Sequence, residues 1–200
     1  MKSSVAMDLL FKDVITDPSE LALDKNRWVK HSLYVGIAAG RIAQAINANS
    51  NKYAYFKKYI EENGPLDVDY AIALGYIHDI GRKINHLLHT TEGYKYLCDL
   101  GYCEEARITL THSFIDNDIN NSADAVTGKD RYEFIRNYLH SIELTPYDNI
   151  IQLCDLFCLE TGFTTVERRL LDLTKRKKVY ENSLIHFDKT MELLKRFEPD

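Results

Sequence analysis

The sequence predicts an all-α protein, folded as a single compact bundle of many helices. Apolar residues recur at spacings of three and four along most of the 200 residues, which is the period of an amphipathic helix. No extended stretch alternates apolar and polar residues as a half-buried strand does. Only four prolines occur, and two of them stand where a helix is expected to begin. We therefore expect helices almost throughout and no sheet.

Capping residues and breaks in the apolar period set the expected helix boundaries. The strings Asp17-Pro18-Ser19-Glu20 and Thr145-Pro146-Tyr147-Asp148 each combine an N-cap, a proline in the first turn and a capping-box acid. Short polar connectors, such as 47–51, separate other segments. The expected helices cover residues 3–11, 18–24, 27–48, 51–62, 67–80, 90–100, 103–115, 129–141, 146–160, 164–175 and 178–197.

Length and patterning favour one domain over residues 1–200. A chain of this length buries roughly 70% of its unfolded surface, which is enough for a real core. Apolar helical patterns also resume soon after each polar connector, so none of these connectors resembles a domain linker. The segment 117–129 is polar and has a glycine near its end, which predicts a flexible surface loop.

The composition excludes several classes of function. Charged residues make up 28% of the chain and the formal net charge is −5, so no bulk positive charge is present to hold extended nucleic acid or an anionic membrane. No segment approaches the ~20 apolar residues of a membrane span. Asp8 interrupts the apolar stretch that a signal peptide would need. We expect a cytoplasmic protein and leave its oligomeric state open, a homodimer included.

The cysteines and one basic run have simple expected roles. Four residues separate Cys98 from Cys103, and three separate Cys154 from Cys158. Neither spacing fits well the cysteine pairs that usually bind zinc. In a reducing cytosol we expect all four to be free thiols, buried as structural residues. The run from Lys175 to Lys178 is expected to be a solvated helix junction that is dispensable for turnover of small substrates. A phosphate-binding patch is the alternative for this run.

Four expected helices each place one polar residue on their apolar stripe: His31, His78, His112 and Asp155. Asp79 follows His78 directly at a helix end. Taken singly, each histidine is explained as a hydrogen-bonded core residue, but an inward carboxylate without a partner is strongly disfavoured. A metal ion would satisfy these groups together. Imidazole and carboxylate ligands suit iron, manganese, zinc or nickel better than calcium.

The residues after this pair extend the candidate site. Ile80-Gly81 supplies a helix break, so that His78 and Asp79 can face one ion although helical neighbours point about 100° apart. Arg82 and Lys83 follow and would stand near the ion, where they could hold an anionic substrate group such as phosphate. The alternative is that they favour a helix C-terminus electrostatically, and this is equally well supported for Lys83.

The string Ile77-His78-Asp79-Ile80-Gly81-Arg82 resembles the signature of the HD superfamily of metal-dependent phosphohydrolases. His31 and Asp155 complete the ordered pattern H…HD…D over residues 31–155. The resemblance implies an HD-domain bundle with the metal site between its central helices. Within this superfamily, the sequence most resembles the bacterial group that splits dinucleoside tetraphosphates symmetrically. The cyclic-dinucleotide branch is less similar, because its Gly-Tyr-Pro element is missing after Glu92.

Members of this superfamily that hold two metals need two further histidines. His89 stands in an H-x3-G element ending at Gly93, and His112 stands in the element Thr109 to Ser113, both similar to those members. His86 is a competitor for the place of His89. The resemblance implies one or two divalent transition-metal ions, with iron first and manganese, nickel or zinc as alternatives. The implied ligands are His31, His78, Asp79 and Asp155 for the first ion, and Asp79 as a bridge with His89 and His112 for the second.

The resemblance implies an enzyme that cleaves a nucleotide, a dinucleoside polyphosphate or another small phosphate ester. His78 and Asp79 would help to hold the ions, and a water or hydroxide bound to these ions would attack the phosphorus of the substrate. Arg82 would stabilise the developing charge, and Arg82 and Lys83 would bind substrate. Two alternatives stay open: a mixed-valent di-iron oxygenase on the same fold, and a non-catalytic module that binds a nucleotide.

Overall fold

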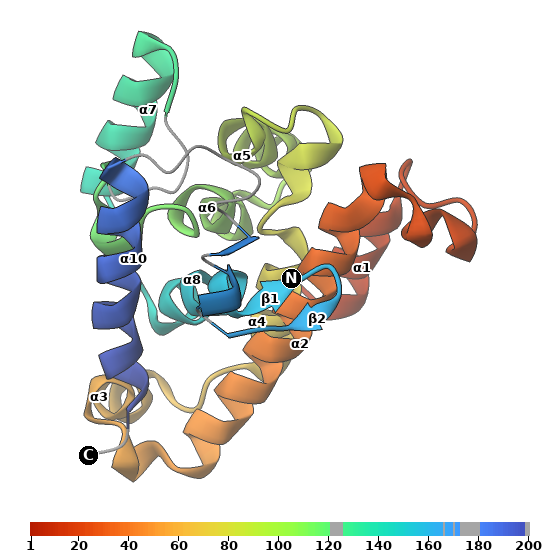
Figure 1. Ribbon diagram of the computed structural model, residues 1–200. Helices are drawn as coiled ribbons and strands as arrows, with labels where there is room; N and C mark the ends of the chain where they lie inside the picture. The colour runs from red at the N-terminus through yellow and green to blue at the C-terminus, as the bar shows by residue number, and fades with distance from the viewer. Residues whose placement is uncertain (121–125, 166, 170, 173–180, 199–200) are drawn as a thin grey trace.

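The computed structural model describes residues 1–120, 126–165, 167–169, 171–172 and 181–198, and the regular secondary structure in these ranges is helical apart from one small hairpin (Figure 1). The all-α prediction is therefore confirmed. No helix in the described ranges is long and apolar enough to cross a membrane. The α-helices are α1 (Ser3–Phe11), α2 (Arg27–Ala48), α3 (Ala54–Asn63), α4 (Val68–Ile77), α5 (His89–Asp99), α6 (Cys103–Thr111), α7 (Lys129–His140), α8 (Pro146–Phe157) and α10 (Glu181–Leu194).

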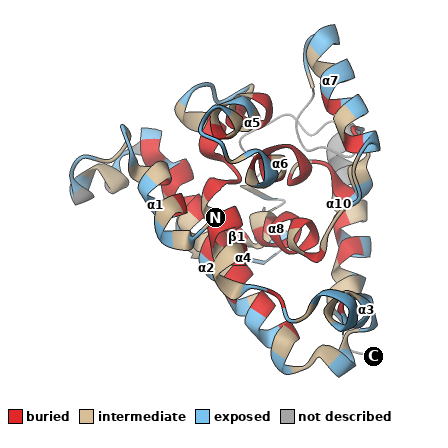
Figure 2. Cartoon of the chain, turned by 180° about the vertical axis from the view of Figure 1, so that it is seen from behind, coloured by how far each residue is buried: buried red, intermediate tan, exposed pale blue. Residues whose placement is uncertain are grey.

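Helices α2 and α4 form the central pair of the bundle. Their backbones approach so closely that a Cβ added at Gly75 would lie 2.4 Å from the Cα of Gly36, so both positions require glycine. Helix α8 packs against this pair, and α5 and α6 pack together beside it. Helix α10 runs along one side of the molecule between α7 and α3 (Figures 1 and 2).

The apolar stripes of these helices meet in one large core. Val35 of α2, Leu74 of α4, Ile108 of α6 and Ile150 of α8 are all buried in it. Figure 2 shows that the buried residues of α4, α6 and α8 face inward, while α3, α5 and α7 expose one side. Burying each large apolar side chain stabilises the fold by roughly 1.5–3 kcal/mol. This core fixes the elements that carry the polar residues described below.

The helix boundaries confirm some capping signals and correct others. Thr145 and Asp148 form the expected capping box at the start of α8. Asp17 accepts a hydrogen bond from Ser19 N, but the segment it caps is the 3₁₀ helix η1 (Pro18–Ala22) and not an α-helix. Helix α4 ends at Ile77, and a short 3₁₀ turn η4 (Ile80–Lys83) follows it.

The expectation of no sheet is wrong at one place. Helix α8 ends at Phe157, because Cys158 adopts an extended conformation. Strand β1 (Cys158–Leu159) then pairs antiparallel with β2 (Gly162–Phe163). Gly162 has φ +125°, which L side chains rarely adopt. Strands of two residues are too short to produce an alternating apolar and polar pattern. The helical period of the apolar residues therefore predicted a helix that extends to residue 160.

One cysteine pair also differs from expectation. Cys98 and Cys103 form a disulfide, because the tight connection between α5 and α6, with Gly101 at φ +86°, brings their Cα atoms to 4.3 Å. Cys154 and Cys158 are free and buried, as expected. The basic run 175–178 lies outside the described residues, as do 121–125 of the segment expected to be a flexible loop.

Candidate metal centre

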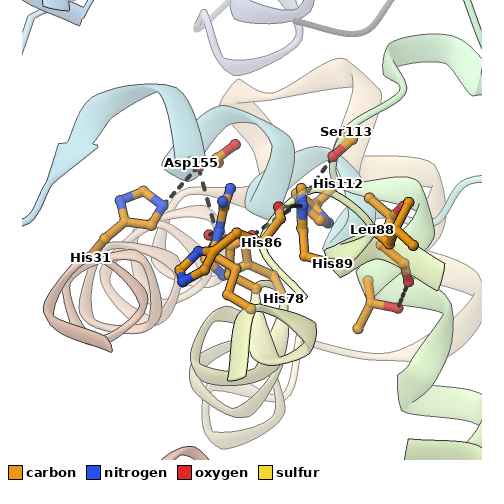
Figure 3. Close-up of polar contacts among 12 residues, drawn as sticks. His31, His78, His86, Leu88, His89, His112, Ser113 and Asp155 are labelled. Carbon is orange, nitrogen blue, oxygen red and sulfur yellow. Dashed lines mark hydrogen bonds and ion pairs between the residues drawn. The ribbon is translucent and has the colours of Figure 1, made fainter. Parts of the chain in front are cut away.

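A first group of possible metal ligands joins α2, the end of α4, and α8. His31 lies on the inward stripe of α2, and its Nε2 is 2.8 Å from Oδ1 of Asp155 on α8. His78 is the C-cap residue of α4, and its Nε2 lies 3.8 Å from the same oxygen. One ligand atom from each of the three residues falls within 4.8 Å of the others. Figure 3 shows these three side chains meeting from three different elements.

A second group joins the turn after α4 to α5 and α6. Oδ1 of Asp79 lies 3.3 Å from Nε2 of His89 and 3.7 Å from Nε2 of His112. All three side chains are buried, and their ligand atoms also fall within 4.8 Å of one another. His89 is the first residue of α5, and His112 is the C-cap residue of α6.

The two groups touch each other through His78. Its Nε2 lies 3.8 Å from Oδ2 of Asp79, and its ring meets the ring of His112 at a centroid distance of 5.0 Å. Asp79 therefore presents Oδ1 to the second group and Oδ2 to the first. Asp79 could therefore contribute an oxygen toward each group, and its Oδ2 also accepts a hydrogen bond from Arg82.

Neighbouring backbone atoms orient three of the imidazoles. Nδ1 of His78 lies 2.7 Å from the carbonyl of Gly75, that of His89 lies 3.1 Å from the carbonyl of His86, and that of His112 lies 2.9 Å from the carbonyl of Ile108. A carbonyl can only accept, so Nδ1 carries the proton in each ring. The Nε2 lone pair is then left as the ligand, as in most histidine metal sites.

Helix α5 is locked against its neighbours where it enters the site. A Cβ added at Gly81 would lie 1.9 Å from the carbonyl oxygen of His89, so only glycine allows this approach. The hydroxyl of Thr109 donates to the carbonyl of Thr90 at 3.0 Å. Arg131 on α7 donates to the hydroxyl of Thr90 at 2.9 Å. Gly81 therefore packs on His89 itself, and Thr109 and Arg131 hold the next residue, Thr90.

The protonation states suit metal binding. Burial lowers the pKa of His78 to about 4, so this imidazole is neutral at pH 7. Burial by itself raises the pKa of Asp79, but the guanidinium of Arg82 and the nearby imidazoles outweigh it and hold that pKa well below its usual range. Burial likewise raises the pKa of Asp155, but the hydrogen bond and charge of His31, the guanidinium of Arg169 and the imidazole of His78 together hold that pKa well below its usual range.

The donor set fits transition-metal ions. Nε2 of His78 and Oδ1 of Asp79 are buried and have no hydrogen-bond partner among the described residues. Leaving such atoms unsatisfied costs about 1–3 kcal/mol each, and a bound ion would remove that cost. Two groups with imidazole and carboxylate ligands suit iron, manganese, zinc or nickel.

The two cations after the HD pair have separate positions. Nε of Arg82 donates to Oδ2 of Asp79, so this guanidinium lies at the site. The ammonium of Lys83 instead lies 3.0 Å from the carbonyl of Lys12 and 3.4 Å from the hydroxyl of Tyr96. The structure does not bring Lys83 to the metal groups, which corrects its expected role in substrate binding. The carbonyls of Leu9 and Lys12, at the C-terminal end of α1, accept from this cation, whereas the alternative expectation concerned the end of the helix that Lys83 itself follows.

The structure also separates the two histidines that competed for one place. The ring of His86 is exposed, and only its carbonyl serves the site, by accepting from His89. Sequence reasoning missed Ser113, whose hydroxyl lies 3.0 Å from Nε2 of His112. The only available signal was its position next to that histidine.

A second buried carboxylate, outside both groups, has a structural role. Asp148 accepts from Arg107 at 2.8 Å, from the hydroxyl of Thr111 at 2.7 Å and from the backbone of Thr145 at 2.8 Å. It thereby ties α6, one residue before His112, to the first turn of α8. Because its oxygens are satisfied by protein donors, Asp148 is not a candidate ligand.

Comparison with known proteins identifies one family. The model of the HD domain matches residues 28–158, a span that contains both groups of candidate ligands and the Arg82 guanidinium. No curated protein and no solved structure matches the chain.

Proposed function

Because the chain belongs to the HD-domain superfamily of metal-dependent phosphohydrolases, we propose that it hydrolyses a small phosphate ester or anhydride, with a nucleotide as the expected class of substrate. The observation that carries the proposal is the pair of largely buried ligand groups that meet where His78 lies beside Asp79. A purely structural cluster would not need six polar groups of this kind in a protein interior.

We propose that His31, His78 and Asp155 hold one divalent ion, while His89, His112 and the shared Asp79 hold a second. When bound, such ions lower the pKa of water and neutralise phosphate charge. The carbonyl-anchored imidazoles supply these positions with fixed geometry, so little reorganisation is needed when the substrate arrives.

The remaining polar groups of the site bind and orient the substrate in this proposal. Arg82 is fixed by Asp79, and its side chain is 27% exposed, so its positive charge lies where it can attract a phosphate group. Asp155, with 25% of its side chain exposed, is on the side that solvent reaches. The substrate would therefore approach from the Asp155 side.

The test uses untagged full-length protein purified without chelator. Elemental mass spectrometry should find close to two transition-metal ions per chain, and a panel of nucleotides and phosphate monoesters should release phosphate or a shorter nucleotide. Folded, metal-replete protein that releases nothing from the panel would overturn the proposal. Iron content with substrate-dependent oxygen consumption would favour the oxygenase alternative, and tight nucleotide binding without turnover would favour a binding module.

A further inference from the structure

The chain that follows the matched HD domain folds back over the first ligand group. After α8, the β1–β2 hairpin reverses its direction, and Thr164 N donates to the carbonyl of Phe157 at 2.9 Å. The ring of Phe163 packs edge-on against Tyr34 of α2 at 5.8 Å, and the guanidinium of Arg41 lies 5.6 Å from the same ring. The hairpin is therefore held on α2, the helix that carries His31.

This reversal delivers Arg169 to the site. Residues 167–169 are helical, and Arg169 N donates to the carbonyl of Thr165 at 2.9 Å. The Nη2 atom of Arg169 lies 3.7 Å from Oδ1 of Asp155, and its Nη1 atom lies 3.7 Å from Oδ2 of Asp172. Only 16% of the side chain is exposed. A cation thus stands beside the most accessible of the six candidate ligands.

The contacts of Arg169 leave donors available. At 3.7 Å the pairs with Asp155 and Asp172 are electrostatic contacts and not short hydrogen bonds. The Nε–H of Arg169 has no hydrogen-bond partner among the residues that the structure describes. A planar guanidinium in this condition is suited to receive two oxygens of one phosphate.

Arg82 and Arg169 flank the same histidine from two sides. Oδ2 of Asp79, which accepts from Arg82, and Oδ1 of Asp155, which faces Arg169, each lie 3.8 Å from Nε2 of His78. When Asp155 binds a metal ion, the ion neutralises part of the negative charge that Asp155 otherwise presents to Arg169. An oxyanion placed between the ion and the guanidinium restores the charge balance.

We propose that Arg169 is a substrate-binding residue, which holds a phosphate oxygen of the substrate on the Asp155 side of the site. The inference rests on the proposed function in that the substrate is taken to carry phosphate. Arg169 lies outside the matched span 28–158, so the family match by itself does not identify this residue.

The experiment measures binding of inorganic phosphate to the metal-loaded full chain by isothermal titration calorimetry. Arg169→Gln should weaken phosphate binding about tenfold or more, because one charge-assisted, bidentate interaction is lost. Arg169→Lys should weaken it less, since the charge stays and the fork is lost. Arg168→Gln is the matched control, because Arg168 is the exposed neighbour on the same segment, and binding should not change. All three variants should keep the metal content of the unchanged protein.

Three results would overturn the inference: no phosphate binding by the metal-loaded protein, unchanged binding by Arg169→Gln, or loss of metal together with phosphate in that variant. The last result would mean that Arg169 positions Asp155 instead. If Arg169→Gln does not fold, unchanged phosphate binding by Arg169→Lys counts against the inference. The proposed function is tested separately by turnover. If phosphate binding depends on Arg169 but the protein shows no turnover, the proposal of hydrolase activity is wrong and the inference about Arg169 stands.

Discussion

His78 and Asp79 are adjacent in the chain, yet the imidazole belongs to one ligand group and Oδ1 of the carboxylate to the other. Helix α4 ends at Ile77, and its C-cap residue His78 keeps helical φ and ψ, whereas Asp79, the N-cap residue of η4, has φ −102° and ψ 11°. This change of direction lets Oδ2 of Asp79 stay 3.8 Å from Nε2 of His78 while Oδ1 faces His89 and His112.

The first prediction concerns this shared carboxylate. Asp79→Asn keeps the shape of the side chain but removes the charge that serves both groups. We expect metal content to fall from about two ions per chain to less than one, and activity to fall by at least about 100-fold. Elemental analysis and initial rates measure these effects. Asp99→Asn is the control, because Asp99 is exposed on α5. Full metal content in Asp79→Asn would contradict the shared role.

The second prediction separates the two ions. His89→Ala should remove only the second ion and leave about one per chain, because His31, His78 and Asp155 remain. His86→Ala is the matched control, since its exposed ring lies outside both groups and its carbonyl is retained. Metal titration of both variants decides the question. A loss of metal in His86→Ala with none in His89→Ala would reverse the assignment.

The parts of the site that depend on local sequence patterns could be predicted from the sequence, and the parts that depend on distant contacts could not. Periodicity placed His31, His78, His112 and Asp155 on inward faces, and the structure brings them together, because one side of each helix must be buried. The position of Lys83 depends on the carbonyls of α1, some 70 residues away in the chain, which no local pattern records.

No local pattern in the sequence could place Arg169 at the site either. Its approach requires the chain to reverse at Gly162, but the apolar period of α8 continues past the end of that helix. The Cys98–Cys103 disulfide likewise depends on the geometry of a turn and not on the spacing alone. Long-range packing therefore supplied what the helical period could not.

The third prediction is a pH dependence of the metal-free protein. The pKa of His78 is about 4 in the folded protein, against 6.5 as its ordinary value. Below pH 6.5 the unfolded chain binds a proton that the folded chain does not, so stability falls as the pH decreases from about 6.5 to about 4. Above that window this penalty is absent. The carboxylates of Asp79 and Asp155 act only below about pH 3.8, because their folded pKa values are lowered.

Urea unfolding at several pH values measures this effect. The free energy of unfolding should drop by about 3 kcal/mol across the window on account of His78. In His78→Gln that part of the slope should vanish. An unchanged slope in this variant would show that another group causes the pH dependence.

The fourth prediction concerns Asp148, the buried carboxylate away from the ions. Asp148→Ala removes the carboxylate partner of Arg107, which keeps the carbonyl of Glu143, and the acceptor of Thr111, so we expect a loss of about 3 kcal/mol in the free energy of unfolding. The exposed Asp130→Asn should change stability by less than about 0.5 kcal/mol. Chemical denaturation compares the two. The folded fraction of Asp148→Ala should still bind metal, and a selective loss of metal at full stability would contradict the structural role.

The last prediction tests whether the approach of η4 to α5 sets the geometry of the second group. Gly81→Ala would place a Cβ 1.9 Å from the carbonyl oxygen of His89, a backbone atom that cannot rotate away. Helix α5 must therefore shift, and His89 shifts with it. We expect the second ion to bind at least about tenfold more weakly, while the first ion binds as before, because none of His31, His78 and Asp155 is on α5.

Gly101→Ala is the matched control: nothing lies within 4 Å of its added Cβ, so it tests only the strain of a positive φ. Competition titration with a chelator measures both affinities, and equal affinities in Gly81→Ala and the unchanged protein would show that His89 reaches Asp79 without this contact.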